Sequence, residues 1–154
     1  GTPDECRDYE RELRKRVDSE GLSEIVVFTG HSSEMPQVYN GLDVVVSAST
    51  SPEPLGTVVI ESLAMARPLV APGHGGAAEM ATHDETALLF RPGDAQDLAR
   101  QIARFHDEPA TADRIRAAAR VHALATFDVA THARKIQAVY DQVLDTPENT
   151  AGLK

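Results

Sequence analysis

Short apolar runs alternate with longer amphipathic segments along this chain. Continuous apolar runs of strand length occur at residues 25–29, 43–47, 69–71 and 88–90. Such runs are typical of parallel strands that helices cover on both faces. The pattern therefore predicts an α/β fold, a doubly wound, Rossmann-like parallel sheet of about four strands followed by C-terminal helices.

The segments between these runs have helical spacing or turn composition. A charged amphipathic helix is expected up to about Ser19, where Gly21 ends it, and a short helix at 36–41. The glycine-rich segment 72–76 is predicted to be a flexible turn. After the last apolar run we expect three helices and then a flexible tail, at 94–106, 111–125, 129–144 and 146–154.

The segment 49–71 is the one around which the other elements are arranged. It begins as a loop that contains two prolines and Gly56, which disfavour regular structure. A helix is predicted over 57–66, and because its apolar residues point nearly all round, we expect it to lie inside the protein. Pro68 then ends the helix ahead of the next strand.

Two carboxylates flank the start of this helix, Glu53 in the loop and Glu61 in the helix. Gly56 allows close approach to the backbone, and a helix N-terminus attracts anions. Helical side chains tilt toward the N-terminus, so Glu61 can reach back to the helix start. This arrangement suits a diphosphate at Gly56 and Thr57, a ribose at Glu61 and a transferring group near Glu53. The alternative is a buried helix with two incidental glutamates.

The residues of this segment also resemble a known family. The run from Glu53-Pro-Leu-Gly through Glu61-Ser-Leu-Ala to Arg67-Pro-Leu-Val-Ala looks like the donor-site signature of retaining glycosyltransferases of the GT-B fold, glycosyltransferase family four. The flanking motifs also match, at Val27-Phe-Thr-Gly30, Tyr39 to Ser49 and Gly75-Gly-Ala-Ala-Glu79. The resemblance covers about residues 22–144, and the ordered set is more specific than any one motif.

Three residues depart from the family's pattern. Leu55 replaces the usual Phe, and we expect it to keep a buried apolar wedge. Arg67 replaces the usual Gly before the proline, and Ala87 replaces the usual Gly before the last strand. The last two departures concern local backbone geometry rather than the donor site.

The resemblance implies a glycosyltransferase that moves a sugar from a nucleotide-diphosphate sugar to an acceptor with retention of configuration. It implies that Glu53 is catalytic, that no metal or other cofactor is needed, and that the donor contacts Glu53, Leu55, Gly56, Thr57, Val58, Glu61 and Ser32. Ser32 enters because the loop after the first strand approaches the base in that family; the alternative is that this loop is a plain surface turn. In the turn at 72–76, His74 is either a substrate contact or an ordinary loop histidine.

The resemblance also implies that part of the enzyme is absent from this sequence. The family's donor domain has about two more strands before residue 25, and a preceding Rossmann-like domain binds the acceptor. We therefore interpret residues 1–154 as the C-terminal, nucleotide-sugar-binding half of a GT-B architecture. The partners expected are the donor and the missing N-terminal acceptor domain, and the isolated chain should not complete transfer.

Composition narrows the class of partner. The 154 residues carry a formal net charge of −9, which argues against nucleic acid and gives no reason to expect direct membrane contact. Cys6 is the only cysteine, so no internal disulfide can form, which favours a cytoplasmic protein. The six histidines do not have metal-site spacing, so no structural metal is expected.

Two other functions remain open. A GT-B-fold epimerase or phosphorylase is one, although the lysines that a pyridoxal phosphate enzyme would need are far from the segment, at Lys15, Lys135 and Lys154. A non-catalytic module of the same fold, serving as a nucleotide-sugar-binding or scaffold subunit, is the other.

Overall fold

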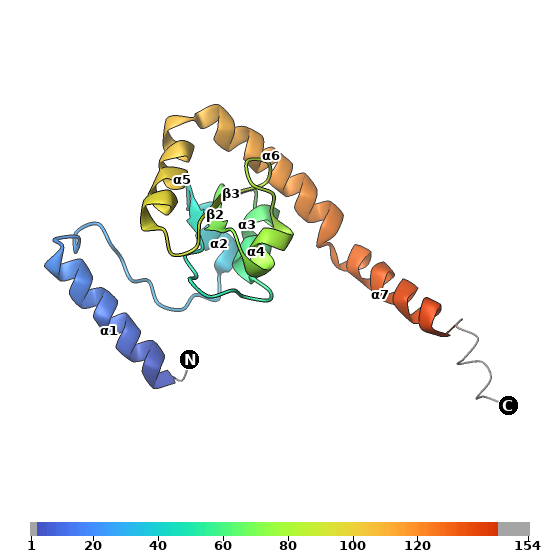
Figure 1. Cartoon of the computed structure of the whole chain (residues 1–154), viewed down its shortest axis with the longest axis horizontal. Helices are drawn as coiled ribbons and strands as arrows, with labels where there is room; N and C mark the ends of the chain where they lie inside the picture. The colour runs from blue at the N-terminus through green and yellow to red at the C-terminus, as the bar shows by residue number, and fades with distance from the viewer. Residues whose placement is uncertain (1–2, 145–154) are drawn as a thin grey trace. The chain divides into compact units, whose positions relative to one another are not determined.

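The computed structural model describes residues 3–144, with side chains from residue 7 onward, so the predicted tail at 146–154 lies outside the described residues. The chain divides into two compact units, residues 1–35 and residues 36–154 (Figure 1). The first contains helix α1 (Pro3–Ser19), which ends as predicted at a left-handed glycine, Gly21 with φ 70°.

The predicted strand at 25–29 is wrong. Residues 25–29 form no strand, and the N–H groups of Ile25 and Val26 both donate 2.9 Å hydrogen bonds to the Leu22 carbonyl. An apolar run favours burial, but a parallel strand also needs a neighbouring backbone to pair with. Among the described residues no strand lies beside 25–29, so its backbone bonds locally and Val27 is 77% exposed.

The second unit is built on a parallel sheet of three strands in the order β1-β2-β3: Val45–Val46, Leu69–Pro72 and Leu88–Phe90. Val70 pairs with Val46 on one side and with Leu88 on the other. All four residues of β2 are buried, as expected for a central parallel strand. The predicted strand at 43–47 is confirmed but shorter than expected.

Helices cover both faces of this sheet. The strands lie between α5 on one side and α3 and α4 on the other (Figure 1). One core cluster packs the sheet against the later helices α5 and α6, and consists of Val70, Leu88, Phe90, Phe105 and Ile115. The helices of this unit are α2 (Met35–Asn40), α3 (Thr57–Ala64), α4 (Gly75–Met80), α5 (Ala95–Asp107), α6 (Pro109–Thr126) and α7 (Val129–Leu144).

The predicted C-terminal helices are confirmed, and two of them begin at a capping aspartate. Asp94 Oδ1 accepts a 2.9 Å hydrogen bond from the Asp97 N–H at the start of α5, and Asp128 Oδ2 accepts one of 3.1 Å from the Thr131 N–H at the start of α7. The predicted turn at 72–76 is wrong in part, because α4 begins at Gly75. The two glycines at the start of α4 pack against the loop that carries Glu53. The sequence pattern does not reveal this contact.

Helix α3 ends two residues before the predicted boundary. The Arg67 N–H donates to the Ser62 carbonyl at 2.9 Å and the Ala66 N–H to the Leu63 carbonyl at 3.1 Å, which is the Schellman arrangement. Its left-handed residue is Ala66, with φ 51°. The departure in backbone geometry therefore falls at Ala66 rather than at Arg67. The arginines of α6 reach this helix end, since Arg120 donates to the Ala64 carbonyl and Arg116 to that of Ala66 at 3.3 Å.

Candidate functional site

The start of helix α3 lies at the carboxyl edge of the sheet, where open α/β folds bind their ligands. Gly56 is its N-cap, buried and extended, with φ −84° and ψ 93°. Within the described part of the chain no side chain caps this helix end. The N–H groups of Thr57 and Val58 therefore remain available to an anion, whereas the Val59 N–H donates a 3.0 Å hydrogen bond to the Gly56 carbonyl.

Glu53 lies directly beside this helix start. Its Oε2 is 3.9 Å from the point where a Cβ on Gly56 would lie, and its Oε1 accepts a hydrogen bond from the Ser49 hydroxyl. The carboxylate is exposed, so it is open to a ligand. The Ser49 hydroxyl is thus engaged with the Glu53 side chain, four residues further along the loop.

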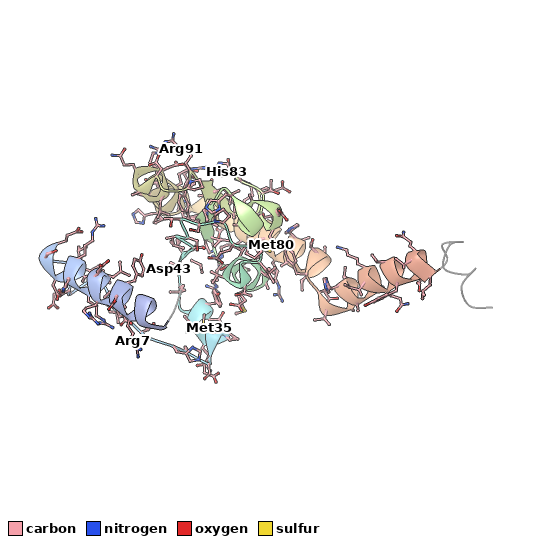
Figure 2. The ribbon with its side chains drawn as sticks, turned by 60° about the horizontal axis from the view of Figure 1, so that its bottom comes forward. Arg7, Met35, Asp43, Met80, His83 and Arg91 are labelled. Carbon is pink, nitrogen blue, oxygen red and sulfur yellow. The ribbon has the colours of Figure 1, made fainter. Side chains whose placement is uncertain are left out.

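The backbone of the loop that carries Glu53 packs closely against two glycines. The Gly76 N–H donates a 2.7 Å hydrogen bond to the Glu53 carbonyl. A Cβ on Gly75 would come within 2.8 Å of that same carbonyl oxygen, and one on Gly76 within 2.7 Å of the Pro54 carbonyl oxygen. Only residues without a side chain allow this approach. Met80, at the other end of α4 and labelled in Figure 2, approaches the start of α3: its Cε lies 3.9 Å from the position that a Cβ on Gly56 would take.

Glu61 is held by a residue that the sequence did not identify as functional. The Tyr39 hydroxyl donates a 2.7 Å hydrogen bond to Glu61 Oε2. Tyr39 is only 3% exposed, whereas Glu61 is an exposed residue. Burial raises the pKa of Tyr39, and the Glu61 carboxylate raises it further, so the hydroxyl stays protonated as a donor. The signal available in the sequence was one aromatic residue in the short helix before β1.

The remaining predicted site residues lie in three places. Thr57 and Val58 form the exposed first turn of α3, next to Gly56. Leu55 is 60% exposed, so the expectation of a buried wedge is wrong, because the described elements leave most of this side chain uncovered. Ser32 belongs to the other compact unit, where its Oγ accepts a 3.1 Å hydrogen bond from the Glu34 N–H.

A pocket lies at this edge of the sheet between the Glu53 loop and the start of α4. Its walls include Glu53, Gly56, His74 and three serines, Ser47, Ser49 and Ser51. Across the described residues, no group of three or more His, Cys, Asp or Glu side chains has the geometry to hold a metal ion. The site therefore offers carboxylates, hydroxyls, an imidazole and backbone N–H groups as its chemistry.

An open helix N-terminus and acidic side chains at the carboxyl edge of a parallel sheet are typical of α/β proteins that bind an anionic or polar ligand at this edge. The sequence matches the family described as glycosyl transferases group 1 over residues 7–122. The chain belongs to this family. Its solved structural neighbours are glycosyltransferases of the GT-B fold, which confirms the predicted fold class.

Individual relatives agree with this membership. The chain is 33% identical over 143 residues to the lipopolysaccharide core biosynthesis mannosyltransferase LpsB of Rhizobium meliloti, a match that covers 88% of this chain and 39% of the relative. It superposes on Anabaena Alr3699/HepE in complex with UDP with a TM-score of 0.85 and 32% identity, covering 88% of this chain and 37% of the other. That protein is also known in complex with UDP-glucose. The chain thus spans less than half the length of these relatives.

A third match concerns an isolated domain. The C-terminal domain of a glycosyl transferase group 1 family protein, LpcC from Francisella tularensis, superposes with a TM-score of 0.71 and 25% identity, covering 83% of this chain and 66% of that domain.

No helix among residues 3–144 is long and apolar enough to span a membrane.

Proposed function

We propose that this chain is the donor-binding half of a retaining glycosyltransferase similar to family four. In this proposal it binds a nucleotide-diphosphate sugar and works with an acceptor-binding domain that is not in this sequence. The observation that supports it most is the open start of α3, with Glu53 beside it and Glu61 within the same helix. UDP and UDP-glucose complexes of a structural neighbour agree with a ligand of this class.

Each part of the site has a role in this proposal. The N–H groups at Gly56 and Thr57 hold the diphosphate, because a helix N-terminus stabilises the charge that grows as the glycosidic bond breaks. The free carboxylate oxygen of Glu61 accepts from the ribose hydroxyls while Tyr39 holds the other oxygen. Glu53 contacts the sugar and stabilises its positive character in the transition state. No metal or other cofactor is required by this scheme, and the single cysteine agrees with a cytoplasmic location.

Calorimetry with UDP, UDP-glucose and GDP-mannose tests the proposal on the wild-type chain. We expect at least one of the three to bind, and Glu61→Ala to weaken that binding by about tenfold or more, since hydrogen bonds to a carboxylate are lost. Glu85→Ala, which removes an exposed glutamate from the turn before β3, is the matched control and should bind normally.

The outcomes separate the alternatives. Absence of heat with all three nucleotides would contradict donor binding and favour the scaffold alternative. Sugar transfer by the isolated chain would contradict the requirement for a second domain. In an enzyme that contains both halves, Glu53→Gln should lower kcat strongly and Glu61→Ala should mainly raise the KM for the donor.

A further inference from the structure

The imidazole of His74 is enclosed by the protein but has no partner in it. Both ring nitrogens are buried, and among the described residues neither forms a hydrogen bond. His74 lies at the N-cap of α4, yet its side chain does not cap that helix. Buried polar groups in native proteins are nearly always hydrogen-bonded, so an orphaned imidazole indicates that its partner is a bound molecule.

The surroundings of His74 narrow the chemistry of that molecule. It lines the same pocket as Glu53, together with the hydroxyls of Ser47, Ser49 and Ser51. The pocket is small, so it receives one polar group from the edge of a larger ligand rather than a whole ring. No lysine or arginine is among its described lining residues.

A phosphate fits this lining poorly, because it would face the Glu53 carboxylate without a compensating cation. A hydroxyl group fits it well. In either protonation state an imidazole presents at least one N–H donor, which can reach the hydroxyl oxygen, while the hydroxyl proton is donated to a carboxylate oxygen. Glu53 Oε1 already accepts from Ser49, which leaves Oε2 for this bond.

We infer that His74 hydrogen-bonds a hydroxyl of the donor's sugar in concert with Glu53, and so helps to decide which sugar is accepted. This inference rests on the proposed function, and it assigns the pocket to the sugar rather than to the nucleotide. One backbone hydrogen bond fixes the position of His74 relative to Glu53. The N–H of Gly76, two residues after His74, donates to the Glu53 carbonyl at 2.7 Å.

The test compares a nucleotide with its sugar conjugate by calorimetry, using UDP against UDP-glucose and GDP against GDP-mannose. His74→Leu removes both nitrogens at similar volume, and we expect it to weaken the preferred sugar conjugate about three- to tenfold. The affinity for the bare nucleotide should stay within about twofold. His74→Gln, which restores an N–H donor, should recover part of the loss, and His106→Gln, at an exposed position on α5, should change nothing.

A second measurement uses the wild-type chain, so it does not depend on whether a variant folds. In histidine side-chain NMR spectra of the wild-type chain, the ring nitrogens of His74 should shift with the sugar conjugate and not with the bare nucleotide. Binding of the conjugate without such a shift, or with equal affinity in His74→Leu, would overturn the role of His74 alone. Failure of the wild-type chain to bind any of these nucleotides would overturn the proposed function and this inference together.

Discussion

The Tyr39 hydroxyl donates a 2.7 Å hydrogen bond to Glu61 Oε2 and so joins helix α2 to helix α3. One partner is buried and the other is at the surface, so the bond fixes an exposed carboxylate from the protein interior. Among the described residues Glu61 Oε1 has no hydrogen-bond partner, so it is open to a ligand. The orientation of this carboxylate is therefore set by a residue 22 positions earlier in the chain.

Tyr39→Phe should release the Glu61 side chain. We expect a loss of about 1 kcal/mol in the free energy of unfolding, because water can replace the lost bond on the exposed side. Nucleotide binding should weaken, since Glu61 is no longer held in place. Urea denaturation and calorimetry measure the two effects, and Tyr140→Phe, at a 61% exposed tyrosine, is the matched control. The idea fails if both variants behave alike.

The ionisation of Tyr39 offers an independent check. Burial, and then the Glu61 carboxylate, raise the pKa of this phenol. In an absorbance titration of the wild-type chain, Tyr39 should supply the ionisation step at the highest pH, and Tyr39→Phe should abolish that step. A titration curve with the same last step in both proteins would contradict the observed environment.

Gly76→Ala should displace the loop that carries Glu53. The added Cβ would lie 2.7 Å from the Pro54 carbonyl oxygen, so the backbone must move. We expect about 2 kcal/mol of destabilisation and weaker sugar-nucleotide binding. Gly41→Ala is the control, because its nearest backbone atom lies at an ordinary 3.5 Å and its effect should stay below about 0.5 kcal/mol. Equal stabilities of the two variants would contradict the close packing of this loop against Gly76.

Ala66→Gly should stabilise the protein by about 1 kcal/mol. Ala66 is the left-handed residue after α3, with φ 51°, a conformation that glycine adopts without steric cost. Ala117→Gly, at an exposed position inside α6, should instead destabilise by about 1 kcal/mol through helix propensity. Thermal or urea denaturation of the two variants gives the comparison. The same sign for both would rule out strain at Ala66.

Asp97 should make stability depend on pH in the acid range. The Arg91 N–H donates to Asp97 Oδ2 at 2.8 Å and, with Arg100, lowers the pKa of Asp97 to about 2. An unfolded aspartate titrates near ~3.9, so this stabilisation is present above that pH and is lost as the pH falls toward about 2.

Asp97→Asn should lower the urea midpoint at neutral pH and flatten its fall between about pH 4 and pH 2. Asp113→Asn removes an exposed carboxylate from α6 and should change stability at pH 7 by less than about 0.5 kcal/mol. An unaltered pH profile in Asp97→Asn would show that this carboxylate is not the group responsible.

Several features of the fold could be predicted from residue patterns because they depend on local chemistry. The helices that begin after Asp94 and Asp128 were predictable from capping side chains, and the strands at 69–72 and 88–90 from uninterrupted apolar runs. The run at 25–29 has the same pattern and forms no strand, since a strand also depends on a neighbour that composition does not specify.

The candidate site divides in the same way. Its residue types and order, from Glu53 through Gly56 to Glu61, follow from the sequence, since a loop glycine and a following helix generate an open N-terminus whatever surrounds them. The exposure of Leu55 was not predictable, because burial depends on what the remaining elements cover.

The sequence by itself determined an α/β chain with an acidic loop and helix at the edge of a parallel sheet. Only the tertiary structure decided that Tyr39 holds Glu61, that two glycines seat the Glu53 loop, and that both nitrogens of His74 are left without a partner. The physical reason is the sequence distance over which each interaction acts. Capping and periodicity act within one or two helical turns. The tertiary contacts join segments about 20 residues apart, and these segments meet only when the whole sheet packs.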